Sequence, residues 1–129
     1  MSNDNQIEQE IQAKGLTAPR VTPADIEDNI VAEHYINLGD AVVAVGWTPC
    51  CAQIMRASDG EHLTTICVLV LRNGFTVTGE SACASPENFD VDLGRKIARQ
   101  NAVSKVWPLM GYELRSRLHR EAGQGDAGN

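Results

Sequence analysis

The stretch of sequence that decides the fold runs from Ile66 to Leu118 and reads ICVLVLRNGFTVTGESACASPENFDVDLGRKIARQNAVSKVWPLMGYELRSRL. It begins within a β-branched, apolar run over Thr65–Leu71, and an alternating segment follows over Phe75–Ser81. Asn73-Gly74 separates the two, and this dipeptide favours the positive φ angles of a type I′ turn. The pattern therefore predicts a β-hairpin. Its first strand is apolar at successive positions, as is typical of a central strand covered on both faces.

The rest of this stretch carries the signals of two helices. Ser85-Pro86 is typical of a helix start, and the helix that it opens is predicted to run to about Val106. Pro108 is expected to end or kink that helix, and a second helix is predicted from Leu109 to about His119. Small residues at a spacing of four would let another backbone, of the sheet or of a second copy, approach the first helix closely: Gly94, Ala98 and Ala102.

Before the hairpin, the clearest signal is the motif Thr22-Pro23-Ala24-Asp25. In this motif the threonine can cap a helix, the proline takes its first position and the aspartate can bond back to the cap. Ile26, Ile30 and Val31 follow at helical spacing. They predict a helix that ends near Tyr35.

Together these elements predict an α+β fold, in which a small antiparallel sheet with a central hairpin packs against an N-terminal helix and two C-terminal helices. Residues 40–45 are rich in Ala and Val and are expected to form a strand, whereas residues 46–62 are treated as a loop. At 129 residues the chain fits one domain. Its predicted parts are a flexible N-terminal arm (1–20), a single α+β domain (21–120) and a disordered tail (121–129).

Composition excludes several classes of protein. The longest apolar run, Ile66–Leu71, is far shorter than the roughly 20 residues that span a bilayer. The first residues, MSNDNQIEQEIQ, lack the basic and apolar regions of a secretory signal, so a cytoplasmic location is expected. Neither a CxxC pair nor a histidine at ligand spacing accompanies the four cysteines, so no metal and no cofactor are predicted: Cys50, Cys51, Cys67 and Cys83.

Charge is distributed unevenly along this acidic chain, whose net charge is −6. Residues 1–50 hold eight acidic and two basic side chains, whereas residues 91–129 hold seven basic and four acidic ones. The basic cluster has two interpretations. It is either a solvated helix face or a local anion site, since a few grouped guanidiniums can dominate the nearby field.

No catalytic residue is predicted, and the chain is not expected to be an enzyme. The three histidines, His34, His62 and His119, have no carboxylate or cysteine at a diagnostic spacing. The segment from Gly79 to Cys83 departs from the GxSxG nucleophile motif at its last position. Glycine-rich phosphate loops are also absent from the sequence.

Anion binding remains possible through arginines. Arg95 and Arg99 lie one helical turn apart, so both guanidiniums can reach one phosphate, and aromatic rings in the same stretch can stack a base. The predicted ligand-binding residues are Arg95, Arg99, Lys96, Asn73, Phe75, Asn88, Asn101, Trp107, Tyr112, Arg115 and Arg117. The acidic balance disfavours long nucleic acid as a partner. A small anionic nucleotide fits better, in a pocket that so short a chain forms most easily between subunits of a homo-oligomer.

Four fragments carry a family resemblance: CVLVLRNGFTVTGESACASPENFD, GRKIARQNA, KVWPLMGYELRSRL and, near the start, PRVTPADIE. Together they closely resemble a widespread family of small tailed-phage proteins. The chain also resembles the phage Thoeris anti-defence proteins, which are oligomeric sponges that bind cyclic ADP-ribose isomers or cyclic nucleotides without degrading them. This resemblance implies sequestration of an immune signal in the cytoplasm of the infected bacterial host. It assigns no ligand contact to any residue of this chain.

Two other hypotheses stay open beside sequestration. The protein could instead be an interaction module, in which an acidic surface from residues 1–45 caps a basic host defence protein such as a nuclease or CRISPR effector. It could also be an enzyme that cleaves a nucleotide. A binding response to signalling nucleotides separates the first two hypotheses, and recovery of intact ligand excludes the third.

Overall fold

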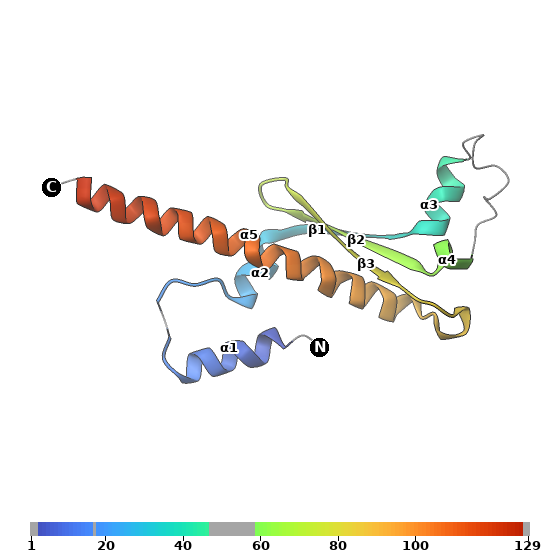
Figure 1. Cartoon of the computed structure of the whole chain (residues 1–129), viewed down its shortest axis with the longest axis horizontal. Coiled ribbons are helices and arrows are strands. Elements are labelled where there is room, and N and C mark those ends of the chain that lie inside the picture. The colour runs from blue at the N-terminus through green and yellow to red at the C-terminus, as the bar shows by residue number, and fades with distance from the viewer. Residues whose placement is uncertain (1–2, 17, 47–58, 128–129) are drawn as a thin grey trace.

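Three antiparallel strands and one long helix form the body of the protein (Figure 1). The computed structural model describes residues 3–16, 18–46 and 59–127. Its elements, in chain order, are α1 (Asp4–Ala13), α2 (Pro23–Asn29), β1 (Ile30–Asn37), α3 (Leu38–Val45), α4 (Asp59–His62), β2 (Thr64–Leu71), β3 (Thr76–Ala82), the 3₁₀ turn η2 (Pro86–Asn88) and α5 (Val91–Ala127). The predicted α+β class is confirmed.

The predicted hairpin is formed by β2 and β3, with β2 in the centre of the sheet and β1 on its other side. Its turn differs in type from the prediction. Gly74 has a φ of +90°, and among the described residues positive φ angles occur only at glycines, so Asn73 does not adopt the type I′ conformation. Instead the Asn73 side chain accepts a hydrogen bond from the Phe75 amide (2.9 Å), and Gly74 alone supplies the left-handed step.

Residues 30–35, predicted as the end of a helix, belong to strand β1, so that prediction is wrong. The capping box at Thr22 and Asp25 is present, but the helix that it starts ends at Asn29. From Ile30 the chain pairs with β2, and Tyr35 lies opposite Cys67. Ile30, Val31 and Tyr35 recur at a helical spacing, but β-branched and aromatic side chains also favour strands. Pairing with the distant strand β2 therefore decided that this segment is a strand.

Residues 40–45, predicted as a strand, form most of helix α3, and that prediction is also wrong. The helix begins after Asn37, whose side chain accepts a hydrogen bond from the Asp40 amide (3.1 Å). The same side chain donates to the carbonyl of His62 (2.8 Å). Asn37 thus caps α3 and ties it to α4.

The two C-terminal helices that were predicted on either side of Pro108 are one continuous helix, α5. Pro108 lacks an amide donor but does not end the helix, which continues through it to Ala127. The start also differs, because Pro86–Asn88 form a 3₁₀ turn and Asp90 caps α5 by accepting from the Leu93 amide (2.9 Å). Residues 1–20, expected as a flexible arm, contain α1, and α5 runs into the tail expected over 121–129. Most of the expected loop 46–62, with Cys50 and Cys51, lies outside the described residues.

Helix α5 lies against one face of the sheet and extends well beyond it (Figure 1). The small residues Ala98 and Ala102 are fully buried, as the spacing predicted, and they pack on Gly79 of β3. A Cβ atom at Gly79 would lie 2.2 Å from the Ala102 amide nitrogen and 2.3 Å from the Ala98 carbonyl oxygen. The two backbones therefore touch, and around this contact lie Ile26, Cys67, Leu69, Leu71, Val77 and Val106.

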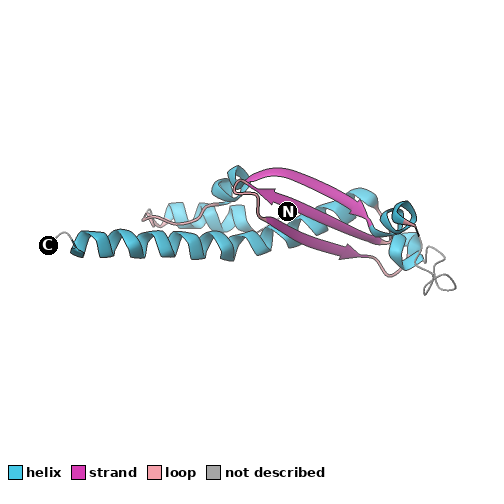
Figure 2. Ribbon diagram, turned by 90° about the horizontal axis from the view of Figure 1, so that it is seen from above, coloured by secondary structure: helices cyan, strands magenta, loops and turns pink. Residues whose placement is uncertain are grey.

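The opposite face of the sheet is not covered in the described part of the chain (Figure 2). Along β2, Thr65, Cys67, Leu69 and Leu71 are buried beneath α5, whereas the alternate residues are half-exposed. The expectation of a strand covered on both faces is met on one face only. No described helix is both long enough and apolar enough to cross a membrane.

Candidate functional site

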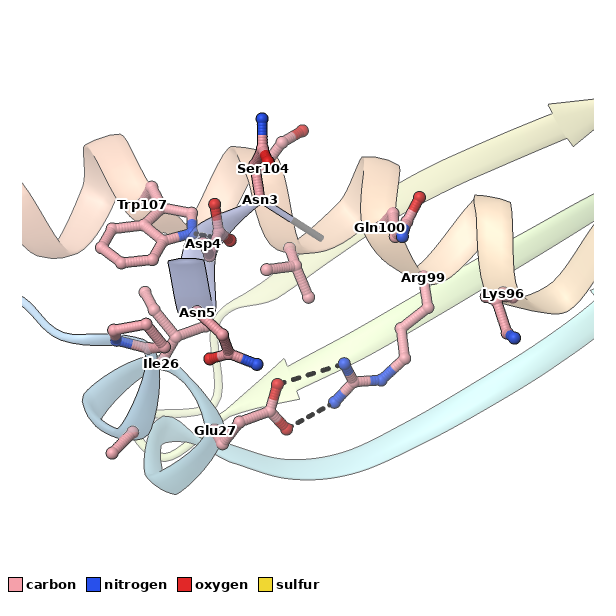
Figure 3. Close-up of a pocket in the computed structure, with 13 residues that line it drawn as sticks. Asn3, Asp4, Asn5, Ile26, Glu27, Lys96, Arg99, Gln100, Ser104 and Trp107 are labelled. Carbon is pink, nitrogen blue, oxygen red and sulfur yellow. Dashed lines mark hydrogen bonds and ion pairs between the residues drawn. The ribbon is translucent and has the colours of Figure 1, made fainter. Parts of the chain in front are cut away.

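A pocket of about 970 Å³ opens between α1, α2 and α5 (Figure 3). One wall is a side of α5, the second is the start of α2, and the third is the first turn of α1. The residues that line it are Asn3, Asp4, Asn5, Pro23, Ala24, Ile26, Glu27, Lys96, Arg99, Gln100, Val103, Ser104 and Trp107. It brings together segments that lie up to 104 residues apart in the sequence, from Asn3 to Trp107.

The wall from α5 follows from the helical repeat. Lys96, Gln100 and Ser104 are spaced by four and Arg99, Val103 and Trp107 by four, so the two rows occupy adjoining stripes of one helix side. The small-residue stripe lies on the sheet and therefore leaves this polar side to face α2 and α1. Figure 3 shows Trp107, Arg99 and Lys96 in this order along the helix.

Two carboxylates hold the Arg99 guanidinium. It donates to both oxygens of Glu27 (3.1 and 2.7 Å) and, through Nε, to Glu33 on β1 (2.6 Å). The hydrogen bond with Glu27 is the largest cause that raises the pKa of Arg99 above its usual range, against the effect of burial. Arg99 is therefore charged but already neutralised, and a phosphate would have to compete with two acids for it.

Helix α1 is held to the pocket by polar contacts. The indole Nε1 of Trp107 donates to Asp4 (3.1 Å), which places the first turn of α1 beside the ring (Figure 3). Farther along, Arg20 donates to both oxygens of Glu8 (2.5 and 2.8 Å) and lowers the pKa of that carboxyl to about 2. No residue of α1, all of which is described, is buried.

Arg95 lies outside this pocket, on the part of α5 that faces β1. Its guanidinium sits over the ring of Tyr35, 5.5 Å from the centroid. Burial raises the pKa of the Tyr35 hydroxyl and that of the neighbouring Cys67 thiol. Arg95 and Arg99, which the sequence grouped as one phosphate clamp, thus make separate contacts with β1.

The other predicted ligand-binding residues are scattered. Asn73 and Arg117 line a second groove beside the hairpin turn, and Asn101 donates to the Glu80 carbonyl (2.7 Å). The remaining four are exposed and lie apart from the first pocket: Phe75, Asn88, Tyr112 and Arg115. Of the predicted set, the first pocket therefore gathers Lys96, Arg99 and Trp107.

Several residues that line the pocket were not among the predicted ligand-binding residues. Gln100 and Ser104 could have been found, because they continue the spacing of four from Lys96. Glu27 and the asparagines Asn3 and Asn5 gave no such signal, since only the packing of α1 and α2 on α5 brings them to the pocket. Within residues 3–16, 18–46 and 59–127, no cluster of three or more His, Cys, Asp or Glu is arranged to hold a metal ion.

Comparison with known proteins supports the resemblance to a phage protein family and gives no match to Thoeris anti-defence proteins. A family model described as Phage protein (N4 Gp49/phage Sf6 gene 66) family matches residues 21–118. The chain belongs to this phage protein family. The matched region contains α2, the three strands and the part of α5 that lines the pocket, whereas α1 lies outside it. Neither a curated protein nor a solved structure matched the chain significantly.

Proposed function

We propose that this phage protein binds a small phosphate-bearing nucleotide in the pocket between α1, α2 and α5 and sequesters it without cleavage. The observation that carries the proposal is that a cationic residue, Lys96, and an aromatic residue, Trp107, lie on the same wall of the pocket. They are 11 residues apart, or about 16 Å along the helix. This separation suits a ligand the size of two linked nucleotides, such as a cyclic dinucleotide or a cyclic ADP-ribose immune signal.

Each part of the pocket offers a different kind of contact. Lys96 offers a positive charge. It makes no ion pair among the described residues, so its ammonium group is open to a phosphate. Trp107 offers the edge or face of an aromatic ring to a base. Glu27 and Asp4 suit the hydroxyl and amino groups of ribose and base, and the amides of Asn5 and Gln100 can serve both kinds of group.

Internal ion pairs weaken the competing hypothesis of an acidic surface that caps a host protein. Glu8, Glu27 and Glu33 belong to the acidic segment of residues 1–45, and each is paired with an arginine of the same chain. The Asp25 side chain accepts from the Thr22 amide in the capping box (2.9 Å). Three of the eight acidic side chains in this segment are therefore already engaged by arginines of the chain itself.

Fluorescence gives a direct test, because the chain has only two tryptophans. In a Trp47→Phe variant, Trp107 is the sole indole, and we expect cyclic di-AMP, cyclic di-GMP or cyclic ADP-ribose to change its emission saturably. Lys96→Ala in that background should weaken binding about tenfold, the effect of one charge-assisted hydrogen bond. Lys105→Ala, which removes the same charge outside the pocket lining, should leave binding unchanged.

The other two hypotheses predict different results. A flat titration with all three nucleotides, together with recovery of one host protein in a pull-down, would favour the interaction module. Release of a cleaved nucleotide after heat denaturation of the complex would favour an enzyme. Equal loss of affinity in Lys96→Ala and Lys105→Ala would contradict the assigned pocket.

A further inference from the structure

Helix α1 is attached to the rest of the protein along a single stripe of its surface. Asp4, Glu8 and Ile11 are half-buried, and their spacing of four and three places them on one side of the helix. The other residues of α1, a helix that is described in full, are exposed. Figure 1 shows α1 outside the two layers formed by the sheet and α5, with its first turn towards α5. The helix therefore adds little to the apolar core.

The first attachment of α1 lies inside the pocket. Asp4 accepts the hydrogen bond from Nε1 of Trp107 (3.1 Å), and its neighbours Asn3 and Asn5 line the same wall. Figure 3 shows Asp4 beside the indole ring. Because the first turn of α1 forms one wall of the pocket, displacement of α1 opens the pocket on that side.

The second attachment lies outside the pocket lining and spans the end of α1. Arg20 donates to both oxygens of Glu8 and, through Nε, to the carbonyl of Leu16 (3.1 Å). Between Glu8 and Arg20 lies Gly15, which follows α1 in a left-handed conformation (φ +69°), and a Cβ atom there would have no described neighbour within 4 Å. A glycine in open surroundings can absorb the backbone rotation of a hinge. The ion pair of Glu8 and Arg20 therefore holds α1 across a hinge at Gly15.

A helix attached in this way opens more readily than the body of the protein. In isolation, a helix of 10 residues is only marginally stable in water. Segments with few buried contacts open locally at a much lower free energy than the whole fold. By contrast, Ala98, Ala102 and Val106 of α5 are fully buried. Helix α1 can therefore detach while α5 and the sheet stay folded.

We propose that α1 is a lid on the pocket, which turns about Gly15 and controls how fast a ligand enters and leaves. The nature of the ligand rests on the proposed function, whereas the motion of α1 does not. Since Glu8 lies outside the pocket lining, its ion pair holds the lid equally well with and without a ligand. It therefore slows entry and release by the same factor and leaves the affinity unchanged. A nucleotide held beneath the lid stays bound for longer.

Hydrogen exchange of the full chain tests the motion without any ligand. Amides of α1 should exchange faster than those of Ala98 and Ala102 in α5. Glu8→Gln should speed the exchange of α1 about threefold, the effect of one weak ion pair, and leave α5 unchanged. Glu10→Gln makes the same change at an exposed residue of α1 that forms no ion pair among the described residues, and it should have no effect.

Stopped-flow fluorescence tests the effect of the lid on binding. The reporter is Trp107 in the Trp47→Phe variant, and the probes are cyclic di-AMP, cyclic di-GMP and cyclic ADP-ribose. Adding Glu8→Gln should raise the association and dissociation rate constants together by about threefold and leave Kd unchanged. Lys96→Ala should instead raise Kd, because it removes a contact with the ligand.

The results distinguish a failure of the lid from a failure of the proposed function. Exchange of α1 as slow as that of Ala98 and Ala102, or exchange that Glu8→Gln does not alter, would overturn the lid whether or not a nucleotide binds. A rise in the dissociation rate constant alone would also overturn it, because Glu8 would then stabilise the complex. Fast exchange that depends on Glu8, with no response to any of the three nucleotides, would support the opening of α1 and contradict the proposed ligand.

Discussion

The two sides of α5 hold their neighbours in different ways. On the sheet side, Ala98 and Ala102 bring the helix backbone against Gly79, and each of these alanines is fully buried. On the pocket side, Ile26 of α2 packs on the same core, but polar contacts, such as those of Arg99 with Glu27 and Trp107 with Asp4, also hold α2 and α1. Close backbone contact tolerates little displacement, whereas polar contacts can be exchanged for those of a ligand. The sheet side of α5 is therefore a close-packed contact, whereas its pocket side presents polar groups.

The largest effect should come from adding one methyl group on the sheet side. In Gly79→Ala the new Cβ would overlap backbone atoms of α5, which cannot rotate away, so we expect a loss of about 3 kcal/mol in the free energy of unfolding. Urea denaturation followed by circular dichroism measures it. The matched control is Gly111→Ala, where no atom lies within 4 Å and the helix should gain up to about 1 kcal/mol. Similar values for the two variants would contradict the comparison.

An intermediate effect is expected where α5 meets α2 and β1. Arg99→Ala removes the charge shared by Glu27 and Glu33 and leaves these carboxylates to repel each other. Since the Arg99 side chain is 29% exposed, solvent screens part of this effect, and we expect a loss of about 1 to 2 kcal/mol. Arg95→Ala, which removes one cation–π contact, should cost about 0.5 kcal/mol. If the order of these two losses were reversed in denaturation experiments, Arg99 would not be the link between the elements.

The smallest effect is expected at α1 and depends on pH. Because the pKa of Glu8 is lowered from 4.5 to about 2 by Arg20, the pair stabilises the arm fully above pH 4.5. This contribution is lost as the pH falls from 4.5 towards 2, when the folded carboxyl takes up a proton. Side-chain NMR titration of Glu8 should give the low pKa, and Arg20→Gln should move it back towards 4.5. An unchanged pKa in Arg20→Gln would exclude the pair as its cause.

The sequence was informative where the pattern is local. The hairpin followed from Asn73-Gly74 between two strand-like runs, and the contact of α5 with the sheet followed from the spacing of Ala98 and Ala102. Both signals depend on neighbours within one element or one turn. Of the predicted ligand-binding residues, Lys96, Arg99 and Trp107 line one pocket, whereas Arg95 and Arg99, which the sequence grouped, make separate contacts.

The sequence failed where distant segments decide the structure. Ile30–Tyr35 fit a helical period, but pairing with β2, more than 30 residues later, made them a strand. Residues 40–45 form a short apolar run, for which periodicity does not distinguish helix from strand. Glu27 and the first turn of α1 reach the pocket only through tertiary packing, so no sequence spacing could reveal that Arg99 is already paired.

The hydrogen bond between Asn37 and His62, here called the clasp, affects the entropy cost of pairing β1 with β2. Paired residues of β2 and β3 such as Val70 and Thr76 are 6 positions apart, whereas Ile36 and Ile66 are 30 apart. Closing the longer loop costs about 1.4 kcal/mol more in chain entropy. The Asn37 side chain donates a hydrogen bond to the His62 carbonyl, which joins the two ends of the segment between β1 and β2. The His62 side chain also packs on Gly39. Once this clasp forms, the length of chain between α3 and α4 adds little to the entropy of joining β1 to the sheet.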